Sequence, residues 1–286
     1  MNLLKSVFIS AFMTWIVLLS LYGFWQLIEA TPPTLAWTGL TLSALGPLLF
    51  FLKAFLFRSP RTPRHPLGFS IICGLGLVMT MAASFRYGPA AGAIHVWAGG
   101  TLLGWLAYLR WYSVFRGRDS AALRPGSRLP EFELESLHGE LVSSASFSTA
   151  PHLLLFYRGN WCPFCTAQIE ELAAAYQRLE KLGLKVILIS PQSIGKAQSL
   201  ASRFNVPMVF MRDRDNNAAK RLGIQHKWGT PMGLQALSYS SDTVLPTIIL
   251  TDAKGNILYS VQTDNYRVRP DPKSFEALLQ AKSPLG

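Results

Sequence analysis

Four long apolar runs in the first 118 residues constrain the fold of this chain more than any other feature. A helix that crosses a bilayer needs about 20 consecutive apolar residues. The first run is uncharged, too long for a removable signal peptide, and lacks a small-residue cleavage site before Thr31. The sequence therefore predicts an α-helical membrane anchor of four transmembrane helices over residues 1–118. The runs are Val7–Ile28, Leu35–Leu52, Leu67–Phe85 and Ala90–Leu109.

Basic residues flank these runs and predict the orientation of the anchor. Ten Lys and Arg residues lie before the first run, in the connection after the second, and after the fourth, whereas the other two connections hold only Arg86. Since bases stay on the cytoplasmic side, we expect a multi-pass cell-membrane protein with both termini in the cytoplasm. Bases that cluster beside apolar runs, and not on a folded face, predict the lipid bilayer as a partner and no nucleic acid.

The second half of the chain changes character after a linker at residues 119–128. Residues 125–286 hold fourteen of the sixteen acids, and strand and helix patterns alternate along them, which favours an α/β sheet domain over residues 129–286. The expected strands are Glu131–Leu134, His152–Tyr157, Leu184–Ile189, Met208–Met211, Thr247–Thr251 and Asn256–Val261. The expected helices are Pro163–Leu182, Ile194–Phe204, Asn216–Leu222 and Pro272–Ala281.

Two of the three cysteines, Cys162 and Cys165, lie between an expected strand and an expected helix. Pro163 suits the first position of that helix. A thiol at Cys162 would face the free N–H groups of the helix start, which stabilise a thiolate, and Arg158 could add positive potential. We expect an exposed, acidic Cys162 to attack and Cys165, about one turn further on, to resolve.

Other interpretations of these residues carry less weight. A zinc site would need a second Cys or His pair with suitable spacing, and the sequence has none, so we expect no metal. A structural disulfide is unusual in the cytoplasm. Arg158 could equally be a solvated strand end. Cys73, within a glycine-rich apolar run, is expected to pack as a small apolar residue.

The segment Leu245-Pro246-Thr247 directly precedes an apolar strand. Thioredoxin folds place a cis-proline at this point, next to the C-x-x-C helix, so we expect Pro246 to be cis and to shape the substrate site together with Trp161 and Arg158.

Residues 128–262 resemble the AhpC/TSA (redoxin, peroxiredoxin-like) branch of the thioredoxin superfamily. An opening hairpin, an active-site loop, a buried strand, a D-x-x-x-x-A-x-x-x-G segment and a closing hairpin follow in the family's order. In this sequence they are residues 129–140, 156–163, 184–190, 212–223 and 245–256. The resemblance implies a thioredoxin-fold domain with antioxidant thiol chemistry, a redox-active Cys162–Cys165 disulfide and no bound cofactor.

The sequence departs from the family at the active site. Typical peroxiredoxins carry Pro-x-x-x-Thr-x-x-Cys, but Leu155 and Gly159 stand at the Pro and Thr positions here. The buried strand carboxylate of thioredoxins is also missing, since Leu153–Tyr157 contains no acid. A thiol-dependent peroxidase supplied by a thioredoxin-like dithiol donor is the first expectation. A thiol–disulfide reductase of protein partners and a non-enzymatic membrane redox sensor stay open, as do the oligomeric state and the roles of residues 224–244 and 263–270.

Overall fold

The computed structural model describes residues 1–57, 59–88, 92–118, 120–275 and 277. The chain divides into two compact units. We call Val7–Arg58 with Thr62–Val114 the helical unit, and Met1–Ser6, Ser59–Arg61 and Phe115–Gly286 the α/β unit.

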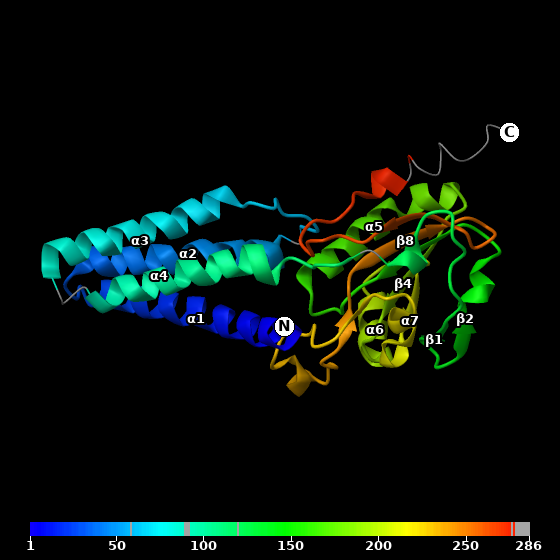
Figure 1. Cartoon of the computed structure of the whole chain (residues 1–286), viewed down its shortest axis with the longest axis horizontal. Coiled ribbons are helices and arrows are strands. Elements are labelled where there is room, and N and C mark those ends of the chain that lie inside the picture. Colours follow the sequence, from blue (N-terminus) through cyan, green and yellow to red (C-terminus); the bar gives the residue numbers. More distant parts are fainter. Residues whose placement is uncertain (58, 89–91, 119, 276, 278–286) are drawn as a thin grey trace. The chain divides into compact units, whose positions relative to one another are not determined.

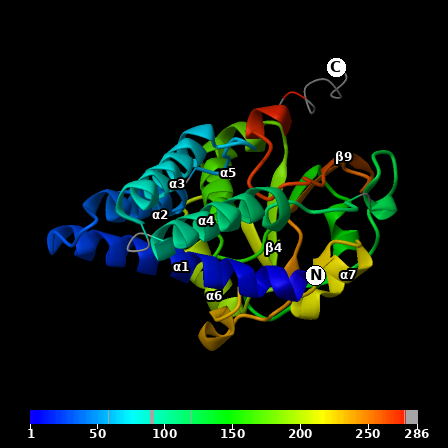
Figure 2. The same cartoon turned by 60° about the vertical axis from the view of Figure 1, so that its left-hand side comes forward.

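The helical unit consists of long helices lying side by side (Figures 1 and 2). Three of them are long and apolar enough to cross a membrane. The prediction of a fourth spanning helix is not supported, because the regular α-helix there has only 16 residues and continues as a π-helix. Sixteen residues rise about 24 Å, less than the roughly 30 Å of a bilayer core, and residues 89–91 lie outside the described part. The helices are α1 (Asn2–Ile28), α2 (Thr34–Leu56), α3 (Leu67–Tyr87), α4 (Gly92–Ala107) and η2 (Tyr108–Tyr112).

Helices α2 and α3 approach each other through glycines. A Cβ atom added to Gly76 would lie 2.5 Å from the carbonyl oxygen of Gly39, and one added to Gly46 would lie 3.0 Å from the backbone nitrogen of Cys73. Small residues permit such close backbone contact between apolar helices. Cys73 is fully buried at this contact, as expected of a packing residue.

The α/β unit is built on a seven-stranded mixed sheet of order β2-β1-β5-β4-β3-β8-β9, and β6 and β7 form a separate pair. Strands β3, β4 and β5 are parallel, while β8 runs antiparallel to β3. The strands are β1 (Glu133–Ser136), β2 (Leu141–Ser143), β3 (His152–Phe156), β4 (Lys185–Ser190), β5 (Val209–Arg212), β6 (Gln225–His226), β7 (Thr243–Val244), β8 (Thr247–Thr251) and β9 (Ile257–Val261). This thioredoxin-like architecture agrees with the sequence prediction.

Three α-helices and several 3-10 turns connect these strands. The α-helices are α5 (Pro163–Lys181), α6 (Ile194–Ala201) and α7 (Asn217–Arg221), and the 3-10 turns are η3 (Ala121–Leu123), η4 (Ser144–Phe147), η5 (Arg214–Asn216) and η6 (Leu234–Leu237). Of the predicted last helix, residues 272–275 and 277 are helical, and the rest lies outside the described residues.

The core explains why the apolar runs of β3 and β4 become central strands. All five residues of β3 are buried, and Leu154 and Phe156 pack with Ile187 and Ile189 of β4 in one cluster. A strand covered on both faces takes a continuous apolar run. Leu123, from the predicted linker, is fully buried in the same cluster, so this part of the linker packs with the sheet.

Candidate active site

The two cysteines lie where β3 gives way to α5. Cys162 directly precedes the helix with an extended backbone (φ −92°, ψ 110°), and Pro163 is the first helical residue. The Cys162 carbonyl accepts hydrogen bonds from the N–H groups of Cys165 at 3.0 Å and Thr166 at 3.1 Å. The backbone therefore sets the two sulfur-bearing residues one helical turn apart.

Gly159 shapes the loop that leads to Cys162. Its φ of +147° is strained for any residue with a Cβ, and an added Cβ would lie 2.7 Å from Trp161 Nε1. Its carbonyl accepts a hydrogen bond from the Cys162 N–H at 3.2 Å. The loop in this form thus requires glycine where typical peroxiredoxins carry Thr.

Cys162 and Cys165 are free thiols, and each is only 1% exposed. The expectation of an exposed attacking thiol is therefore wrong for this state of the protein. Among the residues that the structure describes, no three His, Cys, Asp or Glu side chains gather where they could hold a metal ion.

The two thiols are hydrogen-bonded to each other, and their acidities differ from the prediction. Burial raises the pKa of Cys162 well above its usual range, and the contact with Cys165 raises it further. Burial also acts to raise the pKa of Cys165, but the hydrogen bond from Cys162, the charge of Arg269 and the backbone N–H of Arg158 lower it to about 6. The Cys162 side chain accepts no capping hydrogen bond from α5.

Arg158 is buried, so its interpretation as a solvated strand end is wrong. Its guanidinium lies 4.7 Å from the Trp161 ring centre and 5.6 Å from that of Tyr266. It also donates to the carbonyl of Gly229. The side chains of Arg158 and Trp161 thus stack on each other beside the dithiol.

Residues 263–270 cover the dithiol and include an arginine that sequence reasoning missed. Arg269 is 4% exposed, and its Nη2 lies 3.7 Å from Cys165 Sγ. The Tyr266 ring packs edge-on against Phe164, with 5.4 Å between the centroids. No sequence signal singled out Arg269, because it lies 104 residues beyond Cys165.

A second group that sequence reasoning missed supports the loop before Cys162. Gln192 accepts a hydrogen bond from the Asn160 N–H at 2.9 Å and donates one to the Tyr157 hydroxyl at 3.0 Å. The Tyr239 hydroxyl donates to the Asn160 side chain. Gln192 lies two residues after β4. Because parallel strands end at one edge of a sheet, its position beside the end of β3 could have identified it.

Pro246 differs from the prediction. The only cis peptide bond among the described residues is Pro32–Pro33, so Pro246 is trans. Arg118 donates to the Pro246 carbonyl at 2.9 Å and to Thr247 Oγ1 at 2.7 Å, and so holds the segment in place.

Comparison with known proteins bears on this site. Residues 125–260 match the AhpC/TSA family. This match confirms the resemblance seen in the sequence. The matched residues include the two cysteines, strands β3 and β4 on either side of them in the chain, and the Pro246 segment. The helical unit lies outside the match.

The redoxin part of the chain is similar to peroxiredoxins. A chloroplastic peroxiredoxin Q of Sedum lineare is 30% identical over 128 residues, covering 45% of this chain and 63% of that protein. One from Triticum aestivum is 30% identical over 109 residues, covering 38% and 48%. The chain thus spans about half to two thirds of these relatives. The solved thiol peroxidase from Chromobacterium violaceum is 24% identical, with 57% of this chain and 89% of that one covered and a TM-score of 0.45.

Proposed function

We propose that this protein is a membrane-anchored, thiol-dependent antioxidant oxidoreductase that reduces peroxides with the Cys162–Cys165 pair. The observation that carries the proposal is the pair itself: two free thiols, hydrogen-bonded to each other at the start of α5, with Arg158 and Arg269 beside them. The family match and the names of the relatives, peroxiredoxin and thiol peroxidase, support the peroxide substrate.

In the proposed cycle Cys162 passes its S–H proton to Cys165, with which it is hydrogen-bonded, and attacks a peroxide oxygen as the thiolate. An S–O bond forms, the O–O bond breaks, and the leaving oxygen takes that proton from Cys165 as water or an alcohol. Cys165 then attacks the sulfenic sulfur, which forms the disulfide and releases water. A thioredoxin-like dithiol donor returns the pair to its reduced state. Because both sulfurs are buried, substrate entry requires the chain around them to move.

One observation favours a second function, the reduction of disulfides. Gly159 supplies no hydroxyl at the position where typical peroxiredoxins have Thr, and oriented donors of this kind contribute about 2.7–4 kcal/mol each in well-studied oxyanion sites. The test is consumption of hydrogen peroxide, an organic hydroperoxide and a small disulfide by the full-length protein with a dithiol donor. We expect both peroxides to be consumed. Activity with the disulfide alone would replace the peroxidase proposal with the reductase.

We also propose that the helical unit anchors the protein in the membrane, with the redoxin domain (129–286, after the 119–128 linker) on the cytoplasmic side. The flanking bases support this side. Segments Met1–Ser6 and Ser59–Arg61 belong to the α/β unit, and Ser6 Oγ donates to the Thr230 carbonyl at 2.6 Å. The N-terminus and the α2–α3 connection, which carry flanking bases, are expected on that same side by the base asymmetry.

Labelling with a membrane-impermeant maleimide tests the side. Since Cys162 is buried, the probes are Lys254→Cys, in the exposed β8–β9 turn, and Glu29→Cys, in the α1–α2 connection. We expect intact cells to label Glu29→Cys and to label Lys254→Cys only after permeabilisation. The opposite pattern would show that the orientation is reversed.

A further inference from the structure

The buried resolving thiol, Cys165, needs a group that stabilises its negative charge. To attack, Cys165 must be a thiolate, yet burial opposes its charge, and β3 carries no carboxylate that could take the proton. The titratable and charged groups that act on Cys165 are Cys162, Tyr157, Arg158 and Arg269. None of these described neighbours is an acid with a carboxylate, so a cation has to stabilise the charge.

Arg269 is placed for this task. Its Nη2 lies 3.7 Å from Cys165 Sγ, the side chain is 4% exposed, and no described carboxylate pairs with it. Arg158 lies nearby, but its guanidinium stacks on Trp161 and donates to the Gly229 carbonyl. A buried guanidinium next to a sulfur, with no acid to neutralise it, favours the thiolate.

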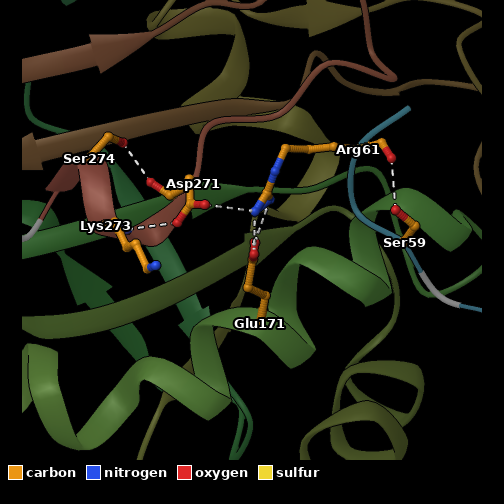
Figure 3. Close-up of polar contacts among 6 residues, drawn as sticks. All are labelled: Ser59, Arg61, Glu171, Asp271, Lys273 and Ser274. Atoms are coloured by element: carbon orange, nitrogen blue, oxygen red, sulfur yellow. Dashed lines mark hydrogen bonds and ion pairs between the residues drawn. The ribbon is translucent and has the colours of Figure 1, made fainter. Parts of the chain in front are cut away.

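Contacts on both sides hold Arg269 in place. Before it, Arg118 donates to the Thr263 carbonyl at 2.8 Å, and Tyr266 packs against Phe164. On the C-terminal side of Arg269, Asp271 is held by Arg61, which points between Asp271 and Glu171 of α5 (Figure 3). Arg61 donates to Glu171 Oε2 at 2.8 Å, and its Nη2 lies 3.5 Å from Asp271 Oδ2.

Asp271 also starts the last helical turn. Its carboxylate accepts a hydrogen bond from the Lys273 N–H at 3.0 Å, and its carbonyl accepts one from Ser274 Oγ at 2.6 Å (Figure 3). The segment is therefore fixed two residues beyond Arg269, on the helix that carries Cys165.

We propose that Arg269 is a catalytic residue of the resolving step, which keeps Cys165 as a thiolate in place of the base used by thioredoxins. This rests on the proposed cycling of Cys162 and Cys165. In that step the Cys165 thiolate attacks Cys162 sulfur in a mixed disulfide, the Cys162–Cys165 bond forms, the old S–S bond breaks, and the partner leaves as a thiolate. With the sulfenic acid, the leaving hydroxide takes a proton as water. Neither version requires a proton to be removed from Cys165 during the step.

The pH profile is a sharper readout than the rate at one pH. A less acidic thiol has less thiolate but a more nucleophilic one, so the two effects partly cancel at neutral pH. The test uses full-length protein in detergent with Cys162→Ser and Cys73→Ser, which leaves Cys165 as the sole thiol and keeps a hydroxyl donor at position 162. Thiolate absorbance is followed against pH.

We expect Arg269→Gln to raise the pKa of Cys165 by about 1 to 3, and Arg269→Lys to restore part of the difference. Arg203→Gln, which removes an exposed arginine paired with Glu170, should leave the titration unchanged. With both cysteines present, decay of a mixed disulfide should shift to higher pH in Arg269→Gln by the same amount.

An unshifted Cys165 in Arg269→Gln overturns the proposal. If that variant does not fold, Arg269→Lys decides the question: its Cys165 must titrate at a pKa above the parent's, and a pKa equal to the parent's overturns the proposal. The titration uses no substrate, so its outcome is independent of whether the protein consumes peroxides or disulfides.

Discussion

The two units bury polar groups of different kinds. In the described part of the helical unit the buried polar side chains are hydroxyls, and tryptophans bond to hydroxyl groups. Trp15 Nε1 donates to the buried Thr101 Oγ1 at 3.0 Å, and Trp105 Nε1 donates to the half-buried Ser70 Oγ at 2.9 Å. The α/β unit instead buries charged groups, among them Arg158 and Arg269. Burial of a charge is costly unless it is paired. The two units therefore differ in their buried polar groups: hydroxyls that support helix packing in the one, and charged side chains near the cysteines in the other.

The largest expected effect separates the cysteines of the two units. Cys162→Ser should reduce turnover to background, because it removes the attacking sulfur. Cys165→Ser should trap mixed disulfides, whereas Cys73→Ser should turn over as the parent does, since Cys73 only packs between α2 and α3. Steady-state turnover and non-reducing gels check this. A loss of activity in Cys73→Ser would break the division between the units.

The buried His226 should make the α/β unit sensitive to acid. Burial, with added repulsion from Arg158, lowers its pKa to about 3. Because the folded pKa lies below the unfolded value of about 6.5, the unfolded chain binds more protons between these values, and stability is lost as pH falls from about 6.5 to 3. The loss amounts to at most about 5 kcal/mol.

His226→Phe removes this titration and keeps a ring against Phe115, which His226 contacts edge-on at 5.3 Å. We expect the melting temperature of the variant to fall less than that of the parent between pH 6.5 and pH 4. Thermal melting of the full-length protein in detergent measures both. Equal acid sensitivity of the two proteins would exclude His226 as the cause.

Replacement of Gly159 by the Thr that typical peroxiredoxins carry should destabilise this protein. Gly159→Thr forces a β-branched residue into φ +147° and against Trp161, at a cost of about 1–3 kcal/mol for the strained backbone. Gly195→Ala, in α6 with open space around its Cβ position, is the control and should change little. A Gly159→Thr variant that melts at the same temperature as the parent and gains peroxidase activity would show that the loop does not require glycine at position 159.

The counterpart in the helical unit is Gly76. An Ala there would meet the backbone of Gly39 and Ser43, so we expect a loss of about 1–3 kcal/mol from overpacking. Gly74→Ala, with nothing near its Cβ position, should be neutral or slightly stabilising. Neither should alter the titration of Cys165, and a shift in Gly76→Ala would show that the units are energetically coupled.

The sequence predicted those parts of the fold that depend on local pattern. The apolar run of β3, the periodicity of α5 and the place of Cys162 before Pro163 are all local. The π-helix that ends α4 at Tyr108 has no such signature, because apolar residues continue past it. The burial of both thiols and the approach of Arg269 to Cys165 have no local signature, since only tertiary folding brings these residues together.

The central claim is that Cys162 and Cys165 form a working redox pair. Its most direct test adds one equivalent of hydrogen peroxide to the reduced full-length protein and maps the products by mass spectrometry. The account predicts a Cys162–Cys165 disulfide, with Cys73 still a thiol. Unreacted Cys162 and Cys165, or oxidation at Cys73 instead, would contradict it.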